Sequence, residues 1–140
     1  MLYRPIYKSR SNGIADWPLV EDILGSSTRN NPANDITGVL VATETDFLQV
    51  LEGEFEPLNE TFERSSRDTR HDKIQLIDFS EIETRKYGTW AMHGVGLFDF
   101  NRDLVIRLSL KYGEHNGNVA FPTQAKVALA LFDEIVAERE

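Results

Sequence analysis

Two apolar runs separated by three polar residues constrain this chain more than any other part of it. They lie in residues 37–53, on either side of Glu44, Thr45 and Asp46. This pattern is typical of two antiparallel strands joined by a tight turn. The second run is apolar except at Gln49, so we expect a central strand with both faces covered. A buried amide without hydrogen bonds costs about 1–3 kcal/mol, so something polar should lie over Gln49. The pattern leaves open whether that partner is a side chain, a water molecule or a ligand.

The composition excludes several classes of function. A net charge of −8 over 140 residues argues against a nucleic-acid surface, which is usually basic. The chain has no cysteine, so we expect no disulfide, no thiolate metal site and no cysteine nucleophile. His71, His93 and His115 lack metal-ligand spacing, so we expect no metal. We see no basic leader and no apolar run near about 18 residues, and therefore expect a cytoplasmic protein without a membrane segment.

The hydrophobic patterns predict the order strand, helix, strand, strand, helix, strand, followed by a fifth strand. Asp16 should cap the first helix, which should end at residues 29–31, and residues 54–57 should open the second. The expected strands are residues 2–8, the two runs of the hairpin, residues 74–82 and residues 90–97. Two right-handed crossovers then give a ferredoxin-like βαββαβ(β) sheet with both helices on one face.

Two more helices should cover the opposite face of this sheet. Asn101 should cap a helix that runs to about Lys111, a turn-rich link follows over residues 113–120, and Pro122 begins the last helix. The apolar stripe of the last helix is Ala128, Leu131, Phe132 and Ile135. The predicted fold class is therefore α+β, with a helical layer on each face of one sheet.

The predicted topology gathers polar residues around a slot between the first two helices. The first and third strands should be neighbours, so Tyr7 and Gln49 face the same helix layer, with Ile23 on one wall and Asn30 and Asn31 at the mouth. The cations at the far end are Arg64, Arg67, Arg70, His71 and Lys73. A flat aromatic ligand with polar edges and a phosphate tail would fit such a slot.

Both polar groups also have a simpler interpretation. Asn30 and Asn31 precede Pro32, where a helix would stop in any case. The cations suit the C-terminus of a helix and could form an ordinary solvated face. The residues alone leave these alternatives open.

The chain resembles the BLUF (blue light using flavin) photoreceptors from about Leu2 to Leu97. The matching segments are Ile6-Tyr7-Lys8-Ser9, Ser27-Thr28-Arg29-Asn30-Asn31-Pro32, Ile36-Thr37-Gly38-Val39-Leu40, residues 47–53, Arg67-Asp68-Thr69-Arg70-His71 and Trp90-Ala91-Met92. The later part, especially Leu108 to Tyr112, is similar to the short stand-alone bacterial members. The resemblance implies a flavin-binding domain over residues 1–97 and a helical extension over 98–140 that packs on its sheet as part of one structural unit.

The resemblance also implies a cofactor and roles for individual residues. FAD would be held non-covalently between the first two helices. Tyr7 matches the redox-active tyrosine, Gln49 the glutamine that switches, and Trp90 and Met92 the pair that exchange places near it. The residues implied in flavin binding are Ile23, Asn30, Asn31, Gln49, Arg64, Asp68, Arg70 and His71.

The family scheme implies a sensor and not an enzyme. Excited flavin takes an electron and a proton from Tyr7, Gln49 rearranges, and a red-shifted signalling state results. Glutamine suits this role because one flat group carries both an acceptor and a donor. Two departures from the family pattern are Pro5, where an aliphatic residue is usual, and Asp35, where glycine is common.

We expect no catalytic output domain, so the signal should leave through a surface. We expect the C-terminal helices to mediate homo-oligomer formation and to bind a separate downstream effector protein, since they carry more apolar positions than one sheet face needs. Two rival functions remain. One is an acylphosphatase-like hydrolase, although the loop at Arg10 lacks a glycine-rich phosphate cradle. The other is a ferredoxin-like protein-interaction domain without a chromophore.

Overall fold

A computed structural model describes residues 1–88 and 91–139 of the chain and confirms the predicted α+β, ferredoxin-like fold. The sheet has the strand order β4-β1-β3-β2-β5, in which β5 is parallel to β2 and the other neighbours are antiparallel. Its elements are β1 (Leu2–Ser11), α1 (Trp17–Asn30), η1 (Pro32–Asn34), β2 (Thr37–Ala42), β3 (Asp46–Glu54), α2 (Phe55–Ser66), β4 (His71–Ile82) and β5 (His93–Gly96). The C-terminal part comprises η2 (Leu97–Asp99), α3 (Arg102–Tyr112), β6 (Glu114–His115), β7 (Asn118–Val119) and α4 (Ala125–Arg139).

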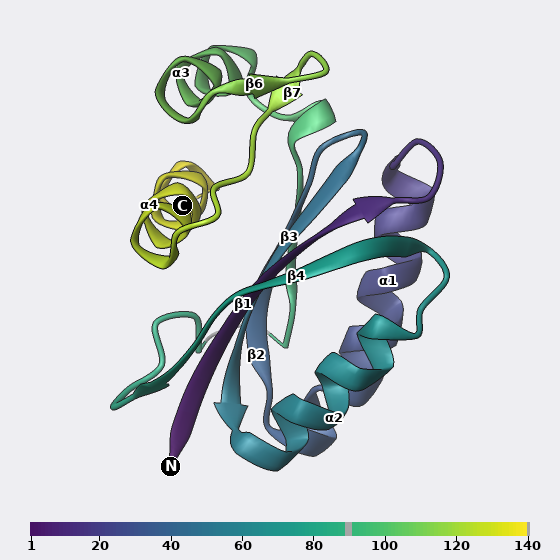
Figure 1. Cartoon of the computed structure of the whole chain (residues 1–140), viewed down its shortest axis with the longest axis vertical. Coiled ribbons are helices and arrows are strands. Elements are labelled where there is room, and N and C mark those ends of the chain that lie inside the picture. The colour runs from purple at the N-terminus through teal and green to yellow at the C-terminus, as the bar shows by residue number, and fades with distance from the viewer. Residues whose placement is uncertain (89–90, 140) are drawn as a thin grey trace.

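The sheet lies between two helical layers. Figure 1 shows α1 and α2 on one face and α3 and α4 on the other. Along the central strand β3, Leu48 and Val50 are buried in the core cluster that contains Leu131 and Phe132 of α4. Leu51 belongs instead to a cluster on the α2 side. The prediction that both faces of this strand are covered is confirmed.

The helix starts follow from local hydrogen bonds. The side chain of Asp16 accepts a bond from the Leu19 amide at 3.1 Å, and Asn101 does the same for Leu104 at 3.1 Å. Each bond satisfies an amide that has no partner within its own helix, which is why such residues are favoured at this position. Both caps are confirmed. No helix of the described ranges 1–88 and 91–139 is long and apolar enough to cross a membrane.

Several predicted boundaries are wrong. β1 extends to Ser11, because pairing with both neighbours continues through Arg10. β4 begins at His71 and α4 at Ala125. β5 begins at His93, so Met92 precedes the strand, while predicted position Trp90 lies outside the described residues. The first and last residues of a strand show little hydrophobic alternation in the sequence, because pairing with neighbouring strands decides where the strand ends.

The turn-rich link contains a small hairpin that the prediction missed. β6 and β7 pair across Asn116 and Gly117, which have φ angles of 53° and 79°. An Asn-Gly dipeptide is the usual sequence signal for such a turn because both positions need positive φ. The signal was present, but the flanking strands of two residues are too short to show alternation.

The structure accounts for both departures from the family pattern. Pairing between β1 and β3 includes Tyr3 and resumes at Ile6, so Pro5 lies in an interruption of that ladder, while on the other side it is paired with Phe79 of β4. Asp35 has a φ of 55°, in the left-handed region that glycine adopts without strain and that aspartate tolerates better than most residues. Asp35 therefore keeps the turn that glycine would form.

Candidate functional site

A cleft of about 340 Å³ lies between α1 and α2 over the sheet. Most of the residues predicted for the site line it: Tyr7, Ile23, Asn30, Asn31, Gln49, Arg64, Asp68, Arg70 and Met92. His71 lines a smaller space of about 30 Å³ that shares Gln49 and Asp68 with the cleft. Trp90 is among the residues that the structure does not describe. The cleft thus brings together side chains from two strands, two helices and three connecting segments.

Tyr7 and Gln49 lie side by side at the floor of the cleft because they are opposite each other in the register of β1 and β3. Tyr7 is 2% exposed, and its ring packs edge to face on Phe62 at 5.2 Å. Its Oη lies 3.4 Å from Oγ of Ser65. Within the described part of the chain, Gln49 makes no side-chain hydrogen bond. A donor and an acceptor therefore remain available on the half-buried amide.

Burial raises the pKa of Tyr7 to about 12, opposed in part by the hydrogen bond to Ser65. Between pH 10 and 12 the folded state keeps a proton that the unfolded state loses, so this group's stabilisation should fall as pH rises through that window. We expect the contribution of Tyr7 to the free energy of unfolding to fall by up to about 2–3 kcal/mol between pH 9 and pH 12. The pKa values of Tyr87 and Tyr112 are also raised, so these groups add a loss of their own. Urea unfolding of wild type and Tyr7→Phe at both pH values separates the contribution of Tyr7 from theirs. An equal loss in both proteins would contradict the assignment.

Asn31 joins the end of α1 to the segment before β5. It is buried, and its Nδ2 donates to the carbonyl oxygen of Ala91 at 2.7 Å. Its own carbonyl accepts the Ile36 amide at 2.9 Å. The amide side chain is therefore fixed at the cleft wall. Asn30 is the last residue of α1, so the asparagine pair also ends the helix, as the simpler interpretation proposed.

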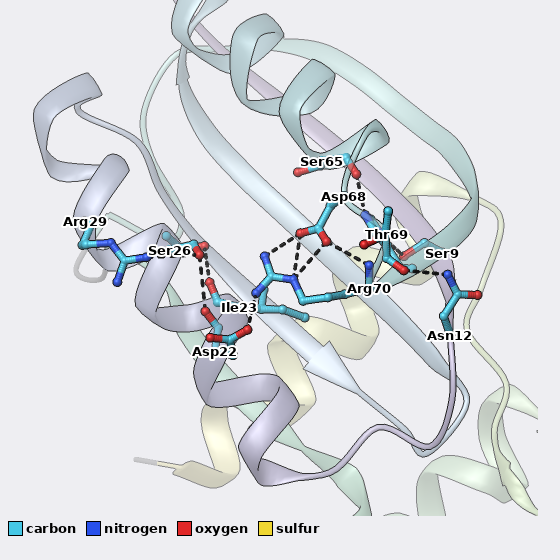
Figure 2. A network of polar contacts seen from close by, with 12 residues as sticks. Ser9, Asn12, Asp22, Ile23, Ser26, Arg29, Ser65, Asp68, Thr69 and Arg70 are labelled. Carbon is cyan, nitrogen blue, oxygen red and sulfur yellow. Dashed lines mark hydrogen bonds and ion pairs between the residues drawn. The ribbon is translucent and has the colours of Figure 1, made fainter.

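Arg70 bridges the two sides of the cleft. Its Nε donates to Oδ1 of Asp68 at 2.9 Å, and its Nη1 donates to Oδ2 of Asp22 on α1 at 3.0 Å, as Figure 2 shows. The hydrogen bond from Arg70 holds the pKa of Asp68 below its usual range, and Asp68 in turn raises the pKa of Arg70. Two carboxylates thus balance this cation. Arg64 and Arg67 at the rim are exposed and form no ion pair within the described residues, although Nη2 of Arg64 donates to Oγ1 of Thr61 at 3.2 Å.

His71 connects the end of α2 to β1. Its Nδ1 lies 2.6 Å from Oγ of Ser9, and its Nε2 lies 2.5 Å from the carbonyl oxygen of Ser65. A carbonyl can only accept, so Nε2 carries a proton; in the neutral ring, Nδ1 then accepts from Ser9. The imidazole therefore orients Ser65, which contacts Tyr7.

Sequence reasoning missed the hydroxyl groups that line the cleft and the carboxylate of Asp22, which pairs with Arg70. Ser26, Ser27, Thr61 and Ser65 line it beside the predicted residues. Ser27 and Ser65 lie at inward-facing helical positions, which is the signal that could have identified them. Asp22 carries no such signal, since it is an exposed acid on an acidic protein and its partner lies far along the chain.

The residues that line the cleft fit a flavin. Ile23, Leu51 and Met92 supply apolar walls, and the Gln49 amide presents both a donor and an acceptor without a partner in the described residues. A flat heterocycle with carbonyl and imide edges needs this combination of apolar faces and amide partners.

Comparison with known proteins identifies the family. The fold and the cleft define a ferredoxin-like domain with a slot for a flat ligand between its first two helices. The family model for sensors of blue light using FAD, the BLUF family, matches residues 2–93. The chain belongs to this family of blue-light flavin sensors.

Similar proteins agree with that assignment. The blue light- and temperature-regulated antirepressor BluF of Escherichia coli (strain K12) is 25% identical over 125 residues, which cover 89% of this chain and 31% of that protein. This chain therefore spans about a third of the length of that curated relative. The ground-state structure of BlsA has a TM-score of 0.80 at 27% identity and covers 97% of this chain and 88% of that chain. The dark-state structure of the BLUF protein BlrB has a TM-score of 0.76 at 26% identity, with coverage of 98% and 96%.

Proposed function

We propose that this protein is a blue-light photoreceptor that holds FAD between α1 and α2 and reports illumination through Tyr7 and Gln49. The observation that carries the proposal is the pairing of these two residues at the floor of one cleft, with the Gln49 amide unpartnered among the described residues. A bound flavin supplies absorption of blue light and, when excited, an acceptor for an electron. The proposal is for a sensor that relays a signal and not for an enzyme.

Each residue of the cleft has a role in this proposal. Tyr7 holds its proton at Oη in the dark, as its raised pKa requires, and is the group that gives up that proton after illumination. Gln49 exchanges donor and acceptor at one position by turning or tautomerising its amide, which makes it a two-state element. Met92, and Trp90 from outside the described residues, are proposed as the side chains that exchange places beside Gln49.

The remaining residues are proposed to hold and orient the flavin. Asn31 presents its fixed amide to the ring edge, and Ile23 packs on the ring face. Asn30, Asp68, Arg70 and His71 support the walls. Arg64 is exposed at the rim, which suits an anionic tail.

The signal is proposed to reach a separate effector protein through the C-terminal helices. Ile106 and Leu110 of α3 and Val127 of α4 are exposed apolar side chains, and we propose that they contribute to the contact surface. The same surface is proposed to support a homo-oligomer. Sedimentation in the dark and under blue light checks this proposal, and a monomer of unchanged sedimentation in both would contradict self-association.

The assignment of Asn31 is tested by flavin titration. Asn31→Ala removes a buried amide from the cleft wall, so we expect FAD affinity to fall roughly tenfold or more. Quenching of flavin fluorescence measures the dissociation constant for FAD and, separately, for FMN. Asn59→Ala is the matched control, because Asn59 is exposed on α2 and should leave affinity unchanged. Equal affinity of Asn31→Ala and wild type would remove Asn31 from the site.

A further inference from the structure

Glu52 is a fully buried carboxylate outside the cleft. It lies on β3 three residues after Gln49 and is 0% exposed. Nε and Nη2 of Arg4 each lie 2.8 Å from its Oε2. A buried charge costs several kcal/mol unless hydrogen bonds satisfy it. The remaining hydrogen-bond donors to Glu52 show which part of the chain this carboxylate holds in place.

Two backbone amides between β4 and β5 also donate to Glu52. The Lys86 amide bonds to Oε2 at 3.0 Å, and the Tyr87 amide bonds to Oε1 at 2.7 Å. Arg85 adds bonds to the carbonyl oxygens of Glu52 at 2.9 Å and Asp35 at 2.7 Å. Residues 85–87, which we name the joint, are therefore fixed to the central strand of the sheet.

The joint also contacts α4. Nζ of Lys86 lies 2.7 Å from Oδ2 of Asp133, and Oη of Tyr87 donates to Oδ1 of Asp133 at 3.3 Å. The buried Tyr87 ring packs edge to face on Phe132 at 6.0 Å. In Figure 1 the chain that follows β4 turns on the α4 side of the sheet. Four residues beyond the joint, the Ala91 carbonyl accepts the side chain of Asn31 at the cleft wall.

We infer that Glu52 is a positioning residue that fixes the joint, and that the joint couples the cleft wall at residues 91–92 to α4 through Asp133. The inference rests on the proposed light response of the cleft. The joint contacts Glu52 on the central strand and Asp133 on α4, so a light-driven change in the cleft wall that reaches the joint along the chain alters the contacts of α4. Asp133 therefore connects a change in the cleft to the surface of the C-terminal helices.

The first test measures the joint in the dark. Glu52→Gln keeps the shape of the side chain but removes its charge, so the Lys86 and Tyr87 amides should exchange with solvent roughly tenfold faster. Glu54→Gln is the control, because Glu54 is exposed at the end of the same strand and its side chain makes no cap bond. Hydrogen exchange of the full flavin-loaded chain gives both rates. Unchanged protection of both amides in Glu52→Gln would overturn the role of Glu52.

The second test measures the coupling to α4 with a surface variant that should fold normally. In wild type, blue light should change hydrogen exchange both in residues 91–97 and in α4. Asp133→Asn should keep the first change and lose at least about half of the second, since its carboxylate makes the contacts with Lys86 and Tyr87. Glu138→Gln, an exposed position on the same helix, should keep both.

Two outcomes of this second test separate the inference from the proposed function. A normal visible light response with an unaltered α4 change in Asp133→Asn overturns the coupling and leaves the photoreceptor proposal intact. A wild-type protein that binds no flavin, or whose spectrum light does not change, overturns both.

Discussion

Tyr7→Phe should bind flavin as tightly as wild type and lose the reversible light-induced red shift. The substitution removes only Oη, and a phenylalanine ring keeps the edge-to-face packing on Phe62. The lost contact to Ser65 is long, at 3.4 Å, so the free energy of unfolding at neutral pH should change by less than about 1 kcal/mol. The photochemical effect should be total, because the serine and threonine hydroxyls that also line the cleft cannot give up an electron with their proton as the phenol of Tyr7 can.

Visible absorption spectra before and after blue illumination measure this effect. Tyr3→Phe is the matched control, since Tyr3 lies on the same strand and packs against Phe55 and Phe79, but is not one of the described residues that line the cleft. Its red shift should equal that of wild type. Gln49→Ala should also lose the shift, because the amide that rearranges is gone. A full reversible shift in either Tyr7→Phe or Gln49→Ala would show that the proposed role of that residue is wrong.

Phe132→Ala should destabilise the whole chain by about 3–5 kcal/mol. Phe132 is 0% exposed and lies in the core cluster with Leu48 and Val50 of the central strand. We propose that residues 98–140 form one cooperative unit with residues 1–97, so the loss should shift a single unfolding transition. Urea unfolding followed by far-UV circular dichroism and by tryptophan fluorescence gives the stability and tests whether the transitions coincide.

Val127→Ala provides the control for that prediction. Val127 is on the same helix but partly exposed, so its truncation should cost less than about 1 kcal/mol. Two separate transitions, with only the helical one shifted by Phe132→Ala, would contradict a single unit.

The fold was largely predictable because its determinants are local or follow from general rules of topology. A run that is apolar except at Gln49 placed this residue on a covered central strand, and side-chain caps marked the starts of α1 and α3. Handedness of the crossovers then made β1 and β3 neighbours, which paired Tyr7 with Gln49. The start of β5 was predicted wrongly because only four residues pair with β2, and no sequence pattern marks where that pairing begins.

The polar network around the cleft was less predictable because its partners are distant in sequence. Glu52 follows an apolar run and has the pattern of a solvated strand end, yet Arg4 and the joint bury it. Arg70 was predicted to bind the flavin, and nothing near it in sequence points to Asp22 on α1. Single-sequence patterns show which face of an element is polar, but not which distant group will neutralise a charge there.

The most direct test of the account is the visible spectrum of the purified full chain with FAD, recorded in the dark, after blue light and again after return to darkness. The account predicts a yellow protein whose flavin band moves to longer wavelength on illumination and returns in the dark, with no net consumption of flavin. A chain that takes up no flavin, or a flavin band that blue light leaves in place, would contradict it.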